Sequence, residues 1–141
     1  MAEPLPPITL SIETTATPAD AWAALTEPDR VVEWLTNATA FHGVGDTYRL
    51  DFGDGSVVDG VVASLEPGRV FSHTWTWVDG EPRHETLVTW LVEPSGAGGC
   101  RITLTHDGWA EAGLDEAARG DHEGYWRGYL DDLASILSGN R

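Results

Sequence analysis

The sequence contains no lysine, and its eight arginines stand against 23 aspartates and glutamates, which gives a formal net charge of −15 at pH 7. Proteins that bind nucleic acids or anionic membrane surfaces need clustered cations that displace counterions. Both surfaces would repel a chain with so few cations and so many carboxylates. The composition therefore argues against nucleic acid as a partner.

Cysteine is almost absent as well. Cys100 is the single cysteine, so the chain can form neither an internal disulfide nor a cysteine metal cluster. The five histidines are scattered, and neither HExxH nor another close metal-ligand spacing occurs. The glycine-rich stretches at 53–55 and 96–99 are turn sequences without the strand-to-helix context of a phosphate loop. We therefore expect no metal and no cofactor.

Long apolar runs are missing too. No segment approaches the roughly 20 apolar residues that cross a membrane. The N-terminal stretch MAEPLPP has neither the basic region nor the apolar core of a secretion signal. We therefore expect a cytoplasmic protein that does not insert into membranes. No linker or repeat divides the 141 residues, so one domain over 1–141 is predicted, with its core at about 8–137.

The longest amphipathic pattern lies at the C-terminal end, from Asp121 to Leu137. Apolar residues recur there at steps of three and four, which is the period of one helix face. The stripe consists of His122, Trp126, Tyr129, Leu130, Leu133, Ile136 and Leu137. Gly124 and Gly128 lower the helix propensity, and we expect them to leave room beside the stripe.

Two short helices are predicted near the N-terminus, after a strand at residues 8–12 with alternating apolar and polar side chains. Thr17 is placed to cap the first helix, Pro18 suits its first position, and Asp20 would complete a capping box. Pro28 opens the second helix. The side chains expected to be buried by that helix are Val31, Trp34 and Leu35.

The middle of the chain has the pattern of short strands joined by tight turns. Strands are predicted at 48–52, 56–65, 70–78, 85–92 and 101–106, with turns at 53–55, 66–68 and 79–82. Gly60 indicates a bulge or a close backbone approach. An antiparallel sheet and an amphipathic helix each have one face that needs cover. We therefore predict an α+β fold in which a curved antiparallel sheet wraps around the long C-terminal helix.

This order of elements resembles the helix-grip fold of the START-like (SRPBCC) superfamily. Four blocks further resemble the family related to the C-terminal domain of the Hsp90 ATPase activator. They are ITLSIETTATPADAWAALTEPDRVVEWL, GDGSVVDGVVASLEPGRVFSHTWTW, VTWLVEPSGAGGCRITLTHDGW and YWRGYLDDLASIL. The resemblance implies a hydrophobic or amphipathic small molecule held between the sheet and the long helix. It assigns no catalytic residue.

Seven tryptophans are the most conspicuous feature of the composition. On the strand at 70–78, the side chains of Phe71, His73, Trp75 and Trp77 share one face. Such rings either fill the core or line a cavity for a flat apolar ligand, with indole N–H groups orienting it. The resemblance favours the cavity. The predicted ligand-binding residues are Trp34, His73, Trp75, Trp77, Trp90, His106, Trp126, Tyr129 and Leu133.

Two histidines are candidates for chemistry, because His73 and His106 lie on apolar strand faces. For each of them, a hydrogen-bonded structural role is the preferred interpretation over that of a general base. The inward or outward direction of Arg49, Asp51 and Trp90 depends on strand parity, which the pattern leaves open.

Three functions are compatible with these features. In order of preference, they are binding of an apolar or aromatic molecule, a cyclase, dehydratase or hydrolase activity in the same cavity, and a co-chaperone or protein-interaction role. An enzyme would need His73 or His106 with a tyrosine or aspartate partner. Hsp90 is the named candidate for the interaction role, and the chain is either a monomer or a homodimer.

Overall fold

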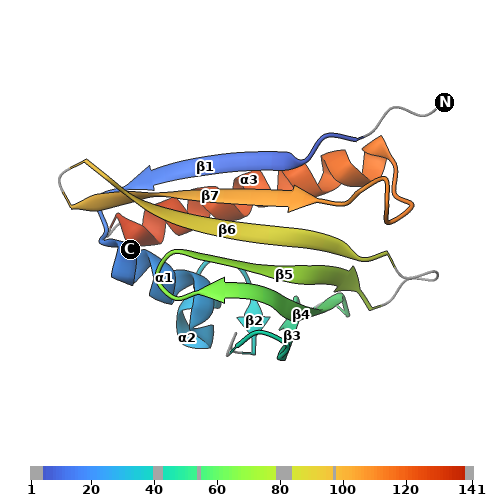
Figure 1. Ribbon diagram of the computed structural model, residues 1–141, viewed down its shortest axis with the longest axis horizontal. Helices are drawn as coiled ribbons and strands as arrows, with labels where there is room; N and C mark the ends of the chain where they lie inside the picture. The colour runs from blue at the N-terminus through green and yellow to red at the C-terminus, as the bar shows by residue number, and fades with distance from the viewer. Residues whose placement is uncertain (1–4, 40–42, 54, 79–83, 97, 139–141) are drawn as a thin grey trace.

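The computed structural model describes residues 5–39, 43–53, 55–78, 84–96 and 98–138. Within these residues, seven strands form one antiparallel sheet in the order β1-β7-β6-β5-β4-β3-β2 (Figure 1). The strands are β1 (Ile8–Thr14), β2 (Asn37–Ala38), β3 (Thr47–Asp51), β4 (Val57–Glu66), β5 (Val70–Trp77), β6 (Thr86–Ser95) and β7 (Gly99–Asp107). The predicted antiparallel meander is confirmed. Asp54 and the predicted turn at 79–82 lie outside the described residues.

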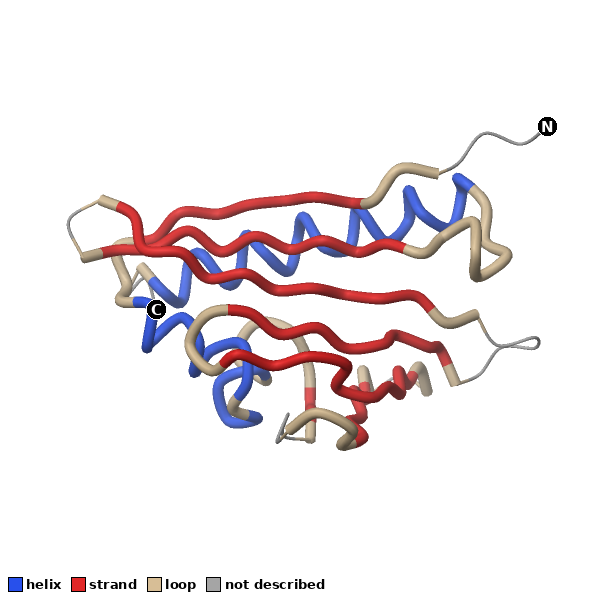
Figure 2. Tube along the Cα trace, in the orientation of Figure 1, coloured by secondary structure: helices blue, strands red, loops and turns tan. Residues whose placement is uncertain are grey.

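Three helices accompany this sheet in the described part of the chain: α1 (Pro18–Thr26), α2 (Pro28–Val31) and α3 (Glu116–Leu137). Figures 1 and 2 show α3 running along one side of the sheet behind β1 and β7, with α1 and α2 grouped at one end. The predicted helix-grip arrangement is therefore confirmed. Among the helices described, none is long and apolar enough to cross a membrane.

The start of α1 follows the predicted local chemistry. Thr17 is the N-cap, and its side-chain oxygen accepts a hydrogen bond from the backbone N–H of Asp20 at 3.1 Å. The Asp20 carboxylate instead accepts a hydrogen bond from Arg30 Nη1 at 3.1 Å. Asp20 thus joins α1 to α2 as well as lying in the first turn of α1.

The beginning of α3 differs from the prediction. The helix starts at Glu116 instead of Asp121, and Asp115 caps it by accepting a hydrogen bond from the backbone N–H of Ala118 at 3.0 Å. The first turn lacks large apolar residues, so hydrophobic periodicity could not detect it. The buried stripe of α3 consists of Trp126, Leu130, Leu133 and Leu137.

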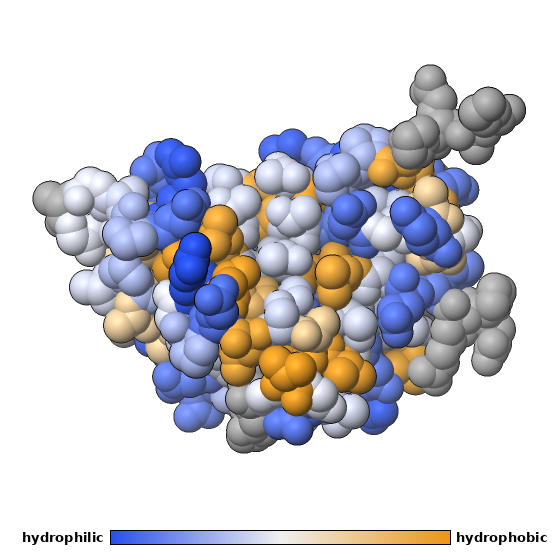
Figure 3. All heavy atoms as spheres, viewed as in Figure 1, coloured by the Kyte–Doolittle hydropathy of each residue, from blue (hydrophilic) through white to orange (hydrophobic). Residues whose placement is uncertain are grey.

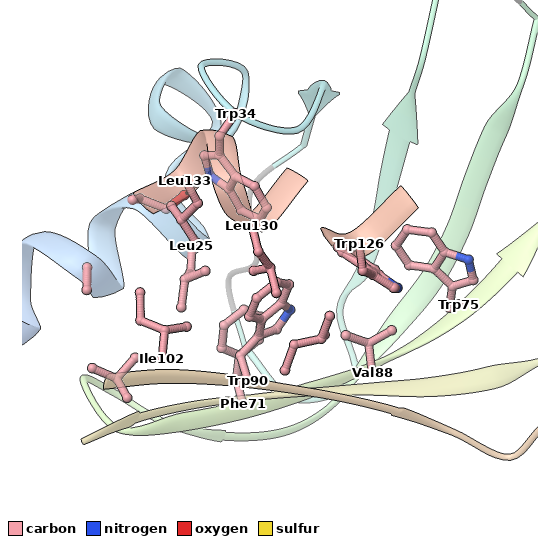
Figure 4. Packing of buried hydrophobic residues seen from close by; sticks show 14 of the residues in the cluster. Leu25, Trp34, Phe71, Trp75, Val88, Trp90, Ile102, Trp126, Leu130 and Leu133 are labelled. Atoms are coloured by element: carbon pink, nitrogen blue, oxygen red, sulfur yellow. Dashed lines mark hydrogen bonds between the residues drawn. The ribbon is translucent and has the colours of Figure 1, made fainter. Parts of the chain in front are cut away.

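The core lies between α3 and the inner face of the sheet. Figure 4 shows Leu130 reaching from α3 toward Trp90 and Phe71 on the strands, with Leu133 beside Leu25 and Trp126 beside Trp75. Burial of such large apolar side chains is the main stabilising term of the fold.

Strand parity is settled by burial. Tyr48 and Leu50 are buried, whereas Arg49 and Asp51 are exposed on the outer face. Arg49 Nε donates to Asp59 Oδ1 at 2.7 Å, which pairs β3 with β4 on that face. Trp90 points inward and is 3% exposed.

The outer face of the sheet is the one seen in Figure 3, where apolar side chains gather in the lower middle of the view. Val61 of β4 and Leu87 of β6 are among the large apolar residues exposed on the surface. No helix of the described chain covers this face in Figures 1 and 2.

Gly60 is the site of a close approach. A Cβ atom at this position would collide with Thr74 O and with the ring of Tyr48. The register shift between β4 and β5 lies nearby, between Val62 and Ser64. Glycine is therefore required at residue 60 because the Tyr48 ring packs directly on the backbone.

Candidate functional site

A cavity of about 590 Å³ opens between the first half of α3 and the end of β5. Leu35, Thr36, Phe52 and Ser56 complete its wall. The aromatic residues that line it are Phe52, Trp75, Trp77, Tyr125, Trp126 and Tyr129. Asp121 and His122 are also part of the wall. The volume is in the range typical of sites for small organic ligands.

Five of these rings form a closed series of neighbouring pairs, here called the aromatic cycle. Its members touch in the order Phe52, Trp77, Trp75, Trp126, Tyr129 and back to Phe52. Successive centroid separations are 5.5, 5.8, 5.1, 6.2 and 6.3 Å. These separations are typical of favourable aromatic pairs. The fold thus assembles one aromatic wall from β5, α3 and the loop after β3.

Three tryptophans donate their indole N–H to a histidine ring nitrogen. The pairs are Trp77 with His122 (2.9 Å), Trp126 with His106 (3.0 Å) and Trp90 with His73 (3.2 Å). Because an indole N–H can only donate, the accepting nitrogen of each histidine carries no proton. The indole N–H groups expected to orient a ligand are therefore committed to histidines, and the histidine tautomers are fixed.

His73 is fully engaged inside the core. Its Nε2 accepts from Trp90, so Nδ1 carries the proton and faces the Tyr48 hydroxyl at 2.9 Å. The Tyr48 hydroxyl in turn donates to Thr74 O. Burial lowers the pKa of His73 from 6.5 to about 4, although the Thr74 carbonyl opposes the shift. His73 is therefore neutral at pH 7.

His106 is held in the same way. Nδ1 accepts from Trp126, and Nε2 lies 2.6 Å from the Thr86 hydroxyl. The hydroxyl completes the chain by donating to Trp75 O at 3.3 Å. Burial, followed by the nearby His122 and His73, lowers the pKa of His106 to about 2. His106 is therefore a neutral ring that bridges α3, β6 and β7.

His122 is the histidine at the cavity surface. Nε2 accepts from Trp77, and Nδ1 donates to Ala118 O at 2.8 Å within α3. Burial lowers its pKa, partly opposed by the Ala118 carbonyl and Asp121. The ring holds Trp77 of β5 against α3, so it fixes one side of the cavity wall.

Trp75 differs from the other tryptophans. Its Nε1 is buried and has no hydrogen-bond partner among the described residues. The nitrogen is also closed off from the cavity surface, so Trp75 offers ring carbons to that surface. Figure 4 shows its ring beside Trp126, and the two centroids are 5.1 Å apart.

The sequence of the chain fits one family model. The model described as "Activator of Hsp90 ATPase homolog 1-like protein" matches residues 15–138. The chain belongs to this family. The sequence resemblance to relatives of the Hsp90 ATPase activator is thereby confirmed. No curated protein matches the chain.

Solved structures confirm the family's fold. Protein MLL2253 from Mesorhizobium loti is similar at a TM-score of 0.85 and 23% identity, covering 96% of this chain and 98% of that one. The Aha1 dimer from Colwellia psychrerythraea has a TM-score of 0.77 and 22% identity, with coverages of 97% and 99%. DynU16, described as "a putative protein in the dynemicin biosynthetic locus", has a TM-score of 0.81 and 25% identity. The match covers 96% of this chain and 49% of the DynU16 chain.

The structure divides the predicted ligand-binding residues into two groups. Those that line the cavity are Trp75, Trp77, Trp126 and Tyr129. Those that lie in the packed core and do not line the cavity are Trp34, His73, Trp90, His106 and Leu133. The core group acts on the cavity only through the rings that it positions, as His106 does for Trp126.

Eight residues that line the cavity were not predicted from the sequence: Leu35, Thr36, Phe52, Ser56, Ala118, Asp121, His122 and Tyr125. One signal was present, because His122 lies on the same helical stripe as Trp126. Phe52 follows β3 in a loop and meets Trp77 only in three dimensions. No local pattern could have paired those two residues.

Metal binding finds no support in the part of the chain that the structure describes. There, no group of three or more His, Cys, Asp or Glu side chains is arranged to hold a metal ion. Cys100 is buried in the core, away from the residues that line the cavity.

Gly124 and Gly128 do not border the cavity. Both are exposed, and a Cβ atom at either position would meet open space. Gly124→Ala and Gly128→Ala should each stabilise the protein by about 0.5–1 kcal/mol, because alanine has the higher helix propensity. Urea unfolding monitored by circular dichroism measures the change. A loss of stability in both variants would contradict the exposed position of this helix face.

Proposed function

We propose that this chain binds an apolar or aromatic small molecule in the cavity between the sheet and α3. The observation that carries the proposal is the aromatic cycle, whose five rings all line one cavity of about 590 Å³. Affinity comes mainly from removing apolar ligand surface from water, at about 25 cal/mol per Å² before the costs of binding. Family membership and the helix-grip fold support the same location.

Binding is better supported than catalysis. An enzyme of the cyclase, dehydratase or hydrolase type would need a general base within reach of its substrate. Both ring nitrogens of His73, His106 and His122 already have hydrogen-bond partners within the protein. His73 does have the tyrosine partner that this alternative requires, but the pair is buried in the core.

Intrinsic fluorescence tests the proposal, because three of the cavity rings are tryptophans. Titration with a panel of neutral, cationic and anionic aromatic compounds should give saturable quenching or an emission shift for at least one class. Tyr129→Ala removes one ring of the wall. It should lower the affinity for that ligand about tenfold, because apolar contact is lost.

Ile136→Ala is the matched control, because Ile136 is a half-buried residue of α3 that does not line the cavity. The Ile136→Ala variant should bind the ligand with the same affinity as the unmodified chain. Equal weakening in both variants, or no response to any compound, would contradict ligand binding in the cavity.

A protein-interaction role is the second candidate, supported by membership of the family named after the activator of Hsp90 ATPase and by similarity to an Aha1 dimer. It predicts capture of Hsp90 by the immobilised chain. Capture that survives Tyr129→Ala but fails after reversal of surface charges would support a surface contact. Absence of capture at micromolar concentration would leave the cavity as the functional feature.

A further inference from the structure

The electrostatic character of the cavity wall is one-sided. Asp121 is the single charged residue among the described lining residues, and neither arginine nor lysine is among them. Arg119, which lies nearby in sequence on α3, is committed to Glu116 and Glu123 at 3.2 and 3.4 Å. With a net charge of −15 on the whole chain, the field at the cavity mouth attracts cations and repels anions.

The indole N–H groups of the wall also offer little to a hydrogen-bond acceptor. The indole N–H groups of Trp77 and Trp126 point to His122 and His106, and that of Trp75 is closed off from the cavity surface. What these three rings offer the cavity is therefore largely aromatic carbon. An anionic head group placed against these rings would lose hydration without gaining an indole donor, which is costly. The other side-chain donors of the lining are the hydroxyl groups of Thr36, Ser56, Tyr125 and Tyr129.

Aromatic carbon surfaces are suited to a different ligand group. The face of an aromatic ring is negative, and it attracts a cation that lies within about 6 Å of the ring centroid. Neighbouring centroids in the aromatic cycle are 5.1 to 6.3 Å apart, so a cation that lies against one ring can also be within this limit of a neighbouring ring.

We propose that the cavity selects apolar cations, specifically an alkylated ammonium group carried on an aromatic or apolar body. The ammonium group lies against the rings of the aromatic cycle, with Asp121 as its counter-charge at the mouth. This inference rests on the proposed function, and it adds the charge and the head group of the ligand. A quaternary ammonium group fits best because it has no N–H that needs an acceptor and is weakly hydrated.

Three probes of nearly equal shape separate charge from size. They are phenyltrimethylammonium, its uncharged carbon isostere tert-butylbenzene, and the anion 4-tert-butylbenzoate. Tryptophan fluorescence or calorimetry should show the cation binding about tenfold more tightly than the isostere, with the anion weakest. Added salt should weaken binding of the cation and leave binding of the isostere unaffected.

Two variants locate the effect. Asp121→Asn should reduce the affinity for the cation several-fold and leave the isostere unchanged, whereas Asp132→Asn, an exposed carboxylate of α3 outside the cavity, is the charge-matched control. Phe52→Leu keeps an apolar side chain but removes one ring face. It should lower the preference for the cation over the isostere.

Each result decides between the two proposals. Equal binding of cation and isostere, or tighter binding of the anion, overturns the choice of a cation but leaves ligand binding in the cavity standing. Binding of the isostere without the cation would likewise overturn the choice of a cation and leave ligand binding in the cavity standing. A preference for the cation that Asp132→Asn lowers as much as Asp121→Asn would place the cation outside the cavity and overturn the inference. Failure of all three probes, together with the fluorescence panel above, overturns both.

Discussion

Lowering the pH from 7 to 5 is expected to reduce the free energy of unfolding by about 2 kcal/mol for each fully buried neutral histidine. His73 and His106 are both of this kind, because burial lowers their pKa values to about 4 and about 2. The unfolded chain protonates both near pH 6.5 and therefore binds more protons than the folded chain below that pH. The contribution of the two neutral histidines to the free energy of unfolding is therefore fully present above pH 6.5, and it is lost as the pH falls below that value. For His73 the loss continues to about pH 4.

Urea unfolding at a series of pH values measures this loss. For a single such histidine the slope approaches about 1.4 kcal/mol per pH unit below pH 6. His106→Gln retains an amide that can donate to Thr86, and it has no group that titrates in this range. At pH 7 the variant should be less stable than the unmodified chain. Its free energy of unfolding should change less steeply with pH, by up to about 1.4 kcal/mol per pH unit, which corresponds to one proton. Stability that is flat between pH 7 and pH 5, or an unchanged slope in the variant, would contradict the neutral buried state.

Gly60→Ala is expected to destabilise the protein by about 2–3 kcal/mol, at the upper end of the cost of overpacking. The new methyl group would collide with Thr74 O and with the Tyr48 ring. Relief requires β4 to move from β5, or Tyr48 to leave its place. Either movement also breaks the hydrogen bond from His73 to Tyr48.

Chemical denaturation of Gly60→Ala and Gly124→Ala makes a matched comparison, because each adds one methyl group at a glycine. The two changes should have opposite signs, with Gly124→Ala slightly stabilising. A double variant Tyr48→Ser with Gly60→Ala removes the ring but not the backbone clash, so it should not recover the lost stability. A neutral Gly60→Ala would show that the strands can separate at no cost, contrary to the packing described.

Features that depend on local pattern could be predicted from the sequence. The alternation in β5 correctly placed Phe71, His73 and Trp75 on one buried face, because the side-chain period of a strand is fixed by its geometry. The cap at Thr17 was likewise predicted from residue type and spacing. Family resemblance then supplied the arrangement of α3 against the sheet, which no single segment determines.

The candidate site was predictable only in part, because it depends on contacts between distant segments. Trp77 and His122 are 45 positions apart, and their hydrogen bond follows from how β5 faces α3. His106 belongs to an apolar strand face, but the pattern could not tell whether it borders the cavity or lies behind Trp126. Depth below a surface depends on the volumes of all surrounding side chains, and periodicity carries no information on it.

The indole N–H resonances of the seven tryptophans give the most direct test of the cavity. In a ¹H–¹⁵N correlation spectrum, assigned through single Trp→Phe variants, saturating phenyltrimethylammonium should shift Trp75, Trp77 and Trp126, which line the cavity. Trp34 and Trp109 should stay in place, because their N–H groups are bonded to Ala24 O and His106 O in the core. Shifts confined to Trp34 and Trp109, or a spectrum that no aromatic ligand changes, would contradict ligand binding against the rings of the aromatic cycle.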